Sequence, residues 1–219
     1  MENKEKKYYG QFSPEVDKVL DELYFKNKYD LLSIECGAFD GLTDSCTKFF
    51  EENYNWKTIN IEPLQNIYNK LIINRPLSIN LNIALSNNSD DKIFTNYKHP
   101  DLNYEWGNGS LNHTKEHKTY LEELCGKYNY VNTIVKCSTY KKIINDLDIK
   151  HVDLFVLDVE GEELNVIDGM IGCNVLPDVF VIEHGHSNTN IFIEKFKEID
   201  FPYKLDHVSF VNSFFIKTK

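Results

Sequence analysis

The sequence predicts an α/β fold in which one doubly wound, mostly parallel sheet of seven strands carries helices on both faces. Short apolar runs alternate with amphipathic helical patterns along most of the chain, and this order produces parallel strands joined by crossover helices. Two strand-like segments then close the C-terminus, near enough to pair as an antiparallel hairpin at one edge of the sheet. The 219 residues suit one generous domain, since a typical domain has roughly 150 residues.

The first half of the predicted sheet consists of three strands separated by two helices. Residues 30–36 are an apolar run that ends in a glycine-containing turn, after which Thr43 or Asp44 is expected to cap a helix. The second strand, residues 57–62, is followed by a proline that is well placed to open the next helix. Residues 78–85 alternate apolar and polar side chains, which is the period of a strand.

The alternation lapses between residues 94 and 130 and then resumes. That stretch is polar and aromatic with one helical pattern at 114–127, so we expect an insertion that leaves the sheet and forms a pocket wall or lid. Beyond it, further strand segments are expected at residues 133–137, 152–158 and 178–183, followed by a hairpin of residues 203–208 and 213–217. Residues 1–29 are expected to form an N-terminal helical extension to a domain that spans residues 30–219.

The composition argues against several classes of function. The 34 acidic and 24 basic residues give a net charge of -10, so the chain lacks the phosphate-neutralising surface that nucleic-acid binding needs. No apolar stretch reaches the roughly 18 residues of a membrane span. The charged N-terminus shows no secretory signal, and the five cysteines include no Cys-x-x-Cys pair. We therefore expect a soluble, cytoplasmic protein without a disulfide framework or zinc ribbon.

Candidate ligand-binding residues lie where the predicted strands end, because ligands of open parallel sheets bind outside the carboxyl ends of the strands. Four of these ends carry a carboxylate: Glu35, Glu62, Asp158 and Glu183. The turn after the first strand does not match the dinucleotide fingerprint Gly-x-Gly-x-x-Gly, because Phe39 replaces its middle glycine. Glu35 could instead bind an ammonium group, and Glu62 could bind ribose hydroxyls. This pair of carboxylates suits S-adenosylmethionine, which has both groups and no phosphate.

Glu183 and His184 are candidates for acid–base chemistry. A histidine at a strand end can act as general base for a substrate hydroxyl, with Glu183 orienting it or holding substrate, although it can equally play a structural role. Asp158 directly follows an apolar run and should point into the same crevice. His113 and His117 have metal-ligand spacing, and the strand-end groups could surround a divalent ion, but no tight metal-binding motif is present and we expect no metal.

Several segments also carry recognisable motifs. Residues 152–164, VDLFVLDVEGEEL, look like a DLLKIDVEGAEL block, and residues 35–41 look like DVGANIG. Shorter matches to EP, ALS and VEVH follow the same chain order at residues 61–63, 84–86 and 181–184. Together these motifs resemble those of the FkbM-type family, within the Rossmann-like class I S-adenosylmethionine-dependent methyltransferases. The chain departs from the family pattern at Val156, where a lysine is frequent, and at Phe39 or Asp40, where an asparagine is expected.

The resemblance implies that the cofactor is S-adenosyl-L-methionine and that the reaction is O-methylation of a sugar, glycan or small natural product. It places Glu35 and Gly37 at the methionine part of the cofactor and Glu62 at the ribose. The further cofactor-binding candidates are Ala38, Phe39, Asp40, Gly41, Asn82, Ser110 and Asp158.

For the methyl-transfer step we expect His184 to be the base, with Asp158 as the carboxylate alternative. The expected partner is a small-molecule or glycan hydroxyl acceptor, and self-association stays open. Two other interpretations also stay open. A nicotinamide-dependent oxidoreductase would likewise place a carboxylate at Glu62, and a non-catalytic partner-binding domain would have a degenerate cofactor site.

Overall fold

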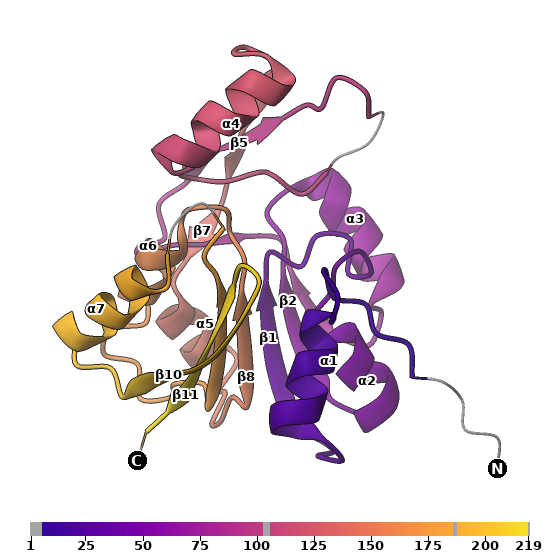
Figure 1. The fold of residues 1–219 in the computed structure, drawn as a ribbon, viewed down its shortest axis with the longest axis vertical. Coiled ribbons are helices and arrows are strands. Elements are labelled where there is room, and N and C mark those ends of the chain that lie inside the picture. The colour runs from indigo at the N-terminus through magenta and orange to yellow at the C-terminus, as the bar shows by residue number, and fades with distance from the viewer. Residues whose placement is uncertain (1–5, 103–105, 186–187, 219) are drawn as a thin grey trace.

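The central sheet of the computed structural model, which describes residues 6–102, 106–185 and 188–218, has seven strands in the order β10-β11-β9-β8-β1-β2-β3 (Figure 1). They are β1 (Leu32–Cys36), β2 (Lys57–Ile61), β3 (Ile79–Leu81), β8 (Leu154–Leu157), β9 (Val179–Glu183), β10 (Tyr203–Ser209) and β11 (Asn212–Lys217). The neighbours β9, β8, β1, β2 and β3 run parallel, whereas β11 is antiparallel to both β9 and β10. The predicted fold class is therefore confirmed.

The C-terminal hairpin lies at one edge of the sheet, as expected. Its antiparallel strand β11 lies inside the sheet, between β9 and β10, and β10 forms the edge. The side chains explain this order, because Phe214 and Phe215 point to opposite faces of β11 and both are fully buried. A strand that buries both faces needs neighbours and cover on each side, whereas the partly exposed β10 tolerates an edge.

Helices cover both faces of the sheet because its strands are apolar on both sides. Leu154 and Val156 face a core formed with α1 (Val16–Leu20), the π-helix η1 (Asp21–Phe25) and α2 (Lys48–Tyr54). Phe155 and Leu157 face the other core, formed with α5 (Tyr140–Asp146), α6 (Glu163–Asp168) and α7 (Asn190–Glu198). The two helices within residues 6–29 thus pack on the sheet as part of its cover, and residues 1–5 of the expected extension lie outside the described chain.

The helix after β1 begins later than expected. Helix α2 starts at Lys48 rather than beside Thr43 or Asp44, and Thr47 precedes it. Asp44 has a φ of 56°, in the left-handed region, and forms a bridge with Gly10. That backbone conformation is incompatible with a helical turn, so residues 41–47 form a loop instead.

The insertion is larger than the expected residues 94–130. The segment 78–85 splits after β3, and β4 (Ala84–Leu85) pairs with β7 (Cys137–Ser138) outside the central sheet. Strands β5 (Lys92–Tyr97) and β6 (Tyr130–Val135) form a separate antiparallel pair, and α4 (Lys115–Cys125) lies between them in the sequence. Residues 103–105 of the insertion lie outside the described chain. The strand expected at residues 133–137 therefore lies outside the central sheet, because period-two alternation marks a strand without specifying its partner.

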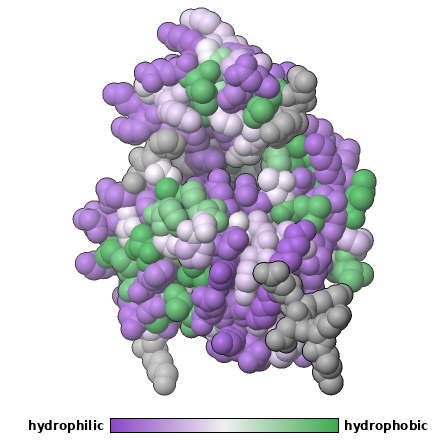
Figure 2. Space-filling view, turned by 45° about the vertical axis from the view of Figure 1, so that its right-hand side comes forward, coloured by the Kyte–Doolittle hydropathy of each residue, from purple (hydrophilic) through white to green (hydrophobic). Residues whose placement is uncertain are grey.

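The insertion stands above the carboxyl ends of the parallel strands, next to α6 and the remaining helix α3 (Gln65–Asn74) (Figure 1). Figure 2 shows that its outer surface is largely hydrophilic, with a few apolar side chains. Within the described residues, no helix combines the length and the apolar character needed to cross a bilayer.

Candidate active site

A pocket with about 670 Å³ of empty volume opens at the carboxyl ends of β1, β2 and β8, beneath the insertion. We call it the central pocket. Its walls from the sheet side include Cys36, Gly37, Phe39, Ile61, Glu62 and Asp158, and its walls from the insertion include Phe94, Asn96, Gly107, Gly109 and Leu111. The lining combines apolar side chains with a few carboxylate and amide groups, which is typical of small-molecule sites. The strand-end location predicted for the ligand site therefore coincides with a real cavity.

The turn after β1 brings two strand ends unusually close together. A Cβ atom added to Gly37, whose φ is 87°, would lie 1.8 Å from the backbone oxygen of Asp158. The N–H groups of Gly37 and Ala38 both donate to Ile61 O at 3.1 Å. Only glycine fits this backbone, and it leaves one wall of the central pocket made of bare main chain.

The rest of the turn divides between lining the pocket and holding the loop. Phe39, with a φ of 47°, lines the pocket. Asp40 accepts hydrogen bonds from Leu42 N and Thr43 N at 2.9 and 2.8 Å, while the Cα of Gly41 packs close to Arg75. Asp40 and Gly41 therefore shape the loop, and neither they nor Ala38 are among the described pocket-lining residues.

Glu35 lies in the strand below the turn, and its carboxylate points into the protein rather than into the central pocket. It accepts hydrogen bonds from Ser45 Oγ at 2.9 Å, from Cys46 N at 2.6 Å and from Thr47 Oγ1. Arg75 Nη1 lies 3.6 Å away, and this arginine is fully buried. These groups occupy the carboxylate within the protein, so the expected contact of Glu35 with the methionine part of the cofactor stays a prediction.

Glu62 directly follows β2 and does line the central pocket. Its Oε1 accepts a hydrogen bond from Leu64 N at 2.7 Å, which orients the carboxylate beside the start of α3. Asn82 and Ser110 support the pocket from outside. Asn82 donates to the backbone oxygens of Glu62 and Pro63 at 3.0 Å, and Ser110 donates to Val159 O at 3.0 Å. Both side chains hydrogen-bond to neighbouring main chain and are not among the described lining residues.

Asp158, Glu160 and Glu183 form a compact acidic cluster in which one oxygen from each lies within 4.8 Å of the others. Asp158 and Glu183 hydrogen-bond to each other, which requires that one of the two carries a proton. Asp158 is reached by solvent through the pocket, yet protein encloses it otherwise, and this desolvation together with Glu183 raises its pKa far above the usual range. Burial also raises the pKa of Glu183 to about 7. The pair therefore shares a proton near neutral pH.

A smaller pocket of about 250 Å³, which we call the side pocket, adjoins the acidic cluster. It is lined by Thr114, His117, Glu160, Gly161, Glu163, Glu183, His184 and Gly185. Glu160 lines both pockets, so the two cavities adjoin the same residue. Desolvation lowers the pKa of His184, whose Nδ1 lies 2.9 Å from Ser213 Oγ. A neutral imidazole in this position can accept a proton.

A sequence model of the FkbM methyltransferase domain matches residues 35–206, which is most of the chain. The chain belongs to the FkbM methyltransferase family. The crystal structure of methyltransferase FkbM from Methylobacillus flagellatus KT is similar, with a TM-score of 0.51 and 12% identity over 85% of this chain and 43% of that chain. The N-terminal domain of human METTL16 in complex with SAH gives a TM-score of 0.40 and 10% identity over 92% of this chain and 65% of that one.

At such identities, the Methylobacillus structure supports the fold alone, and this chain spans less than half of that protein's length. A comparison with curated proteins gives no match. The match therefore shows the family of the chain, while the roles of the individual site residues depend on the geometry described above.

The site of this FkbM-family chain also contains groups that the sequence did not single out. Glu160 lines both pockets, and its Oε2 lies 3.3 Å from Nδ1 of His117, which is 5% exposed in the insertion. Gly161 packs so closely on the insertion that an added Cβ would lie 2.4 Å from Asn112 O. Glu160 falls in the recognisable DVEG block, which was the available signal, whereas its partner is far away in sequence.

Proposed function

We propose that this FkbM-family methyltransferase uses S-adenosyl-L-methionine to methylate a hydroxyl oxygen of an uncharged acceptor, such as a sugar, a glycan or a small natural product. The observation that carries the proposal is that two pockets adjoin the same residue, Glu160. The central pocket suits a cofactor, and the side pocket lies on Glu160, Glu183 and His184.

The residues of the central pocket fit S-adenosyl-L-methionine. Gly37 lines this pocket with main chain, and the Glu62 carboxylate can accept hydrogen bonds from ribose hydroxyls. Leu85, Phe94 and Leu111 supply apolar surface for an adenine ring. None of the described lining residues is Lys or Arg, so this pocket offers no cation to a pyrophosphate, which disfavours a nicotinamide dinucleotide.

When bound, the cofactor supplies an electrophilic methyl group on a sulfonium. The protein has to hold the acceptor oxygen in line with that methyl group and take the hydroxyl proton as the new bond forms. His184 is our candidate base, because burial favours its neutral form and it lines the side pocket. Asp158 is the alternative, and Glu183 is placed to orient the acceptor through the proton it shares with Asp158.

The charge of the side pocket favours an uncharged acceptor. Glu160, Glu163 and Glu183 line it, and burial raises the pKa of Glu163 to about 7. A phosphate or carboxylate on the acceptor would face these groups and would add a like charge to a desolvated site. Neutral hydroxyls can instead donate to the carboxylates and accept from their protonated forms.

The cofactor assignment is tested by calorimetric titration of S-adenosyl-L-methionine into the wild type and Glu62→Gln. We expect the variant to bind about tenfold or more weakly, because a hydrogen bond to a charged group contributes roughly 1.5–3 kcal/mol. His184→Ala should keep the affinity of the wild type but lose turnover in a radiolabelled methyl-transfer assay. Equal affinity of Glu62→Gln and wild type would refute the ribose role, and normal turnover of His184→Ala would remove it as the base.

The acceptor class is tested with matched pairs of substrates, each a neutral glycan or glycoside and its phosphorylated or uronic-acid counterpart. We expect methyl transfer to the neutral members. Preferential methylation of the anionic members would contradict the electrostatic argument, even if cofactor binding behaves as expected.

A further inference from the structure

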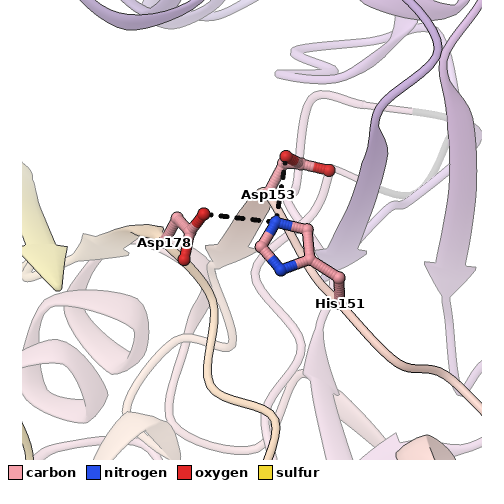
Figure 3. A group of neighbouring side chains, drawn as sticks. All are labelled: His151, Asp153 and Asp178. Carbon is pink, nitrogen blue, oxygen red and sulfur yellow. Dashed lines mark hydrogen bonds and ion pairs between the residues drawn. The ribbon is translucent and has the colours of Figure 1, made fainter.

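A second cluster of metal-ligating side chains lies at the amino ends of two central strands, whereas the central pocket lies at the carboxyl ends. His151 and Asp153 precede β8, and Asp178 directly precedes β9 (Figure 3). Asp153 and Asp158 flank the two ends of β8. At about 3.3 Å per residue, roughly 16 Å of extended strand separates them, so this cluster is distinct from the methyl-transfer site.

The two carboxylates of this cluster converge on one nitrogen atom. His151 Nε2 lies 3.2 Å from Asp153 Oδ1 and 3.2 Å from Asp178 Oδ2 (Figure 3). A single N–H bond points in one direction, so it cannot align well with two acceptors that come from neighbouring strands. A metal ion bound to all three atoms would satisfy both carboxylates at once.

The outer oxygen of each carboxylate is already held by a separate donor. Asp153 Oδ2 accepts from Leu32 N at 2.9 Å, and Asp178 Oδ1 lies 2.8 Å from Lys217 Nζ. The main chain beneath is held as well, since Val179 N donates to Asp153 O at 3.0 Å and Lys217 N donates to Asp178 O at 2.9 Å. The inner oxygens are therefore presented from rigid strand starts, which is the kind of outer-shell support that fixes metal ligands.

We propose that His151, Asp153 and Asp178 bind a zinc ion. Zinc takes imidazole nitrogen and carboxylate oxygen at about 2.0–2.2 Å in a tetrahedron, which places neighbouring ligand atoms about 3.3–3.5 Å apart. The two observed nitrogen–oxygen separations of 3.2 Å are close to that spacing. His151 and Asp178 have side chains 55% and 45% exposed, so water can reach the fourth position. Magnesium and calcium fit less well because they prefer six or more oxygen ligands.

The ion joins the chain ahead of two neighbouring strands of the central sheet. Lys217 on β11 forms an ion pair with Asp178, which offsets part of the negative charge and connects this carboxylate to a third strand. Because the imidazole must be neutral to bind a metal, zinc affinity should fall as the pH is lowered. The role we assign to the ion is to connect the segments that precede β8 and β9, and it takes no part in methyl transfer.

The experiment is calorimetric titration of zinc chloride into the full chain, with thermal unfolding in parallel. We expect one site in the wild type and a higher Tm with zinc. His151→Ala and Asp178→Asn should each bind about tenfold or more weakly and lose the rise in Tm. Asp148→Asn, which removes an exposed nearby carboxylate outside the cluster, should behave like the wild type. Zinc-edge X-ray absorption should show only nitrogen and oxygen ligands.

Three further outcomes would overturn the proposal. If the wild type shows no zinc-dependent change in heat or Tm, the three side chains form only an ion pair. If Glu160→Gln abolishes binding while His151→Ala retains it, the ion occupies the acidic cluster of the methyl-transfer site. Sulfur ligands in the absorption spectrum would likewise assign the ion to the cysteines instead.

Discussion

Replacement of Glu35 tests whether this carboxylate supports the loop before α2 or binds the cofactor directly. The side chain is 4% exposed and accepts hydrogen bonds from Ser45, Cys46 and Thr47, with Arg75 nearby. Glu35→Ala would remove all of these acceptors from buried donors. Because a buried donor left unsatisfied costs roughly 1–3 kcal/mol, and a broken buried ion pair roughly 3–5 kcal/mol, the total could be large.

The remaining partners of Arg75 reduce that estimate. Arg75 keeps its ion pair with Glu51, so the arginine is not left alone in the core. We therefore take the lower end, about 3 kcal/mol for Glu35→Ala and about 2 kcal/mol for the isosteric Glu35→Gln. For a chain of 219 residues, where 1 kcal/mol corresponds to about 2–4 °C, the alanine variant should lose about 6–12 °C in Tm.

The assay combines urea unfolding with calorimetric titration of S-adenosyl-L-methionine, and uses Glu194→Gln, an exposed carboxylate on α7, as the control. We expect Glu35→Gln to be less stable while its affinity for the cofactor, measured well below its Tm, changes less than tenfold. A variant with unchanged stability and affinity lowered a hundredfold or more would refute the structural role. That result would restore the direct contact implied by the family resemblance.

Three other predictions concern the turn, the acidic pair and the core. Gly37→Ala should destabilise the protein by more than about 4 kcal/mol in urea unfolding, because the new Cβ would lie 1.8 Å from Asp158 O. The control Gly126→Ala has a similar positive φ but nothing within 4 Å of the new Cβ, so it should cost only about 1 kcal/mol. Similar losses in the two variants would contradict the clash. The folded-state pKa of Glu183 is raised from 4.5 to about 7, so the folded state holds this proton more tightly. The contribution of Glu183 to stability should therefore fall as pH rises from about 4.5 to about 7 and then level off, and a Glu183→Gln variant with an equally steep profile over this range would refute this. The Tyr140 hydroxyl is buried with no hydrogen-bond partner among the described residues. Tyr140→Phe should therefore leave the free energy of unfolding unchanged or raise it by about 1 kcal/mol. A clear decrease in the free energy of unfolding would show that the hydroxyl has a partner.

Much of the fold could be predicted from local patterns. The two-faced apolar runs at 154–157 and 179–182 indicated strands covered on both sides, and the structure confirms them as β8 and β9. The same patterns did not place residues 133–137, because alternation identifies a strand but not the strand it pairs with. The hairpin order likewise followed from the burial of Phe214 and Phe215, which depends on the neighbours that the completed sheet supplies.

The candidate site shows a similar division. Parallel strand ends meet at one edge, so the sequence could place Glu62, Asp158 and Glu183 near one another. It could not show that Asp158 and Glu183 share a hydrogen bond, or that Glu35 turns away toward Arg75. Nothing in the spacing connected the insertion to the acidic block, yet His117 lies beside Glu160.

The sequence by itself determined the strand ends, the glycine turn and the family to which the chain belongs, because these depend on the order of residue types over short stretches. Only the tertiary structure decided which carboxylates open into a pocket and which are occupied inside the protein. The direction of a side chain and the pKa of its acidic group depend on partners distant in sequence, as they do for Glu35 beside Arg75 and for Asp158 beside Glu183.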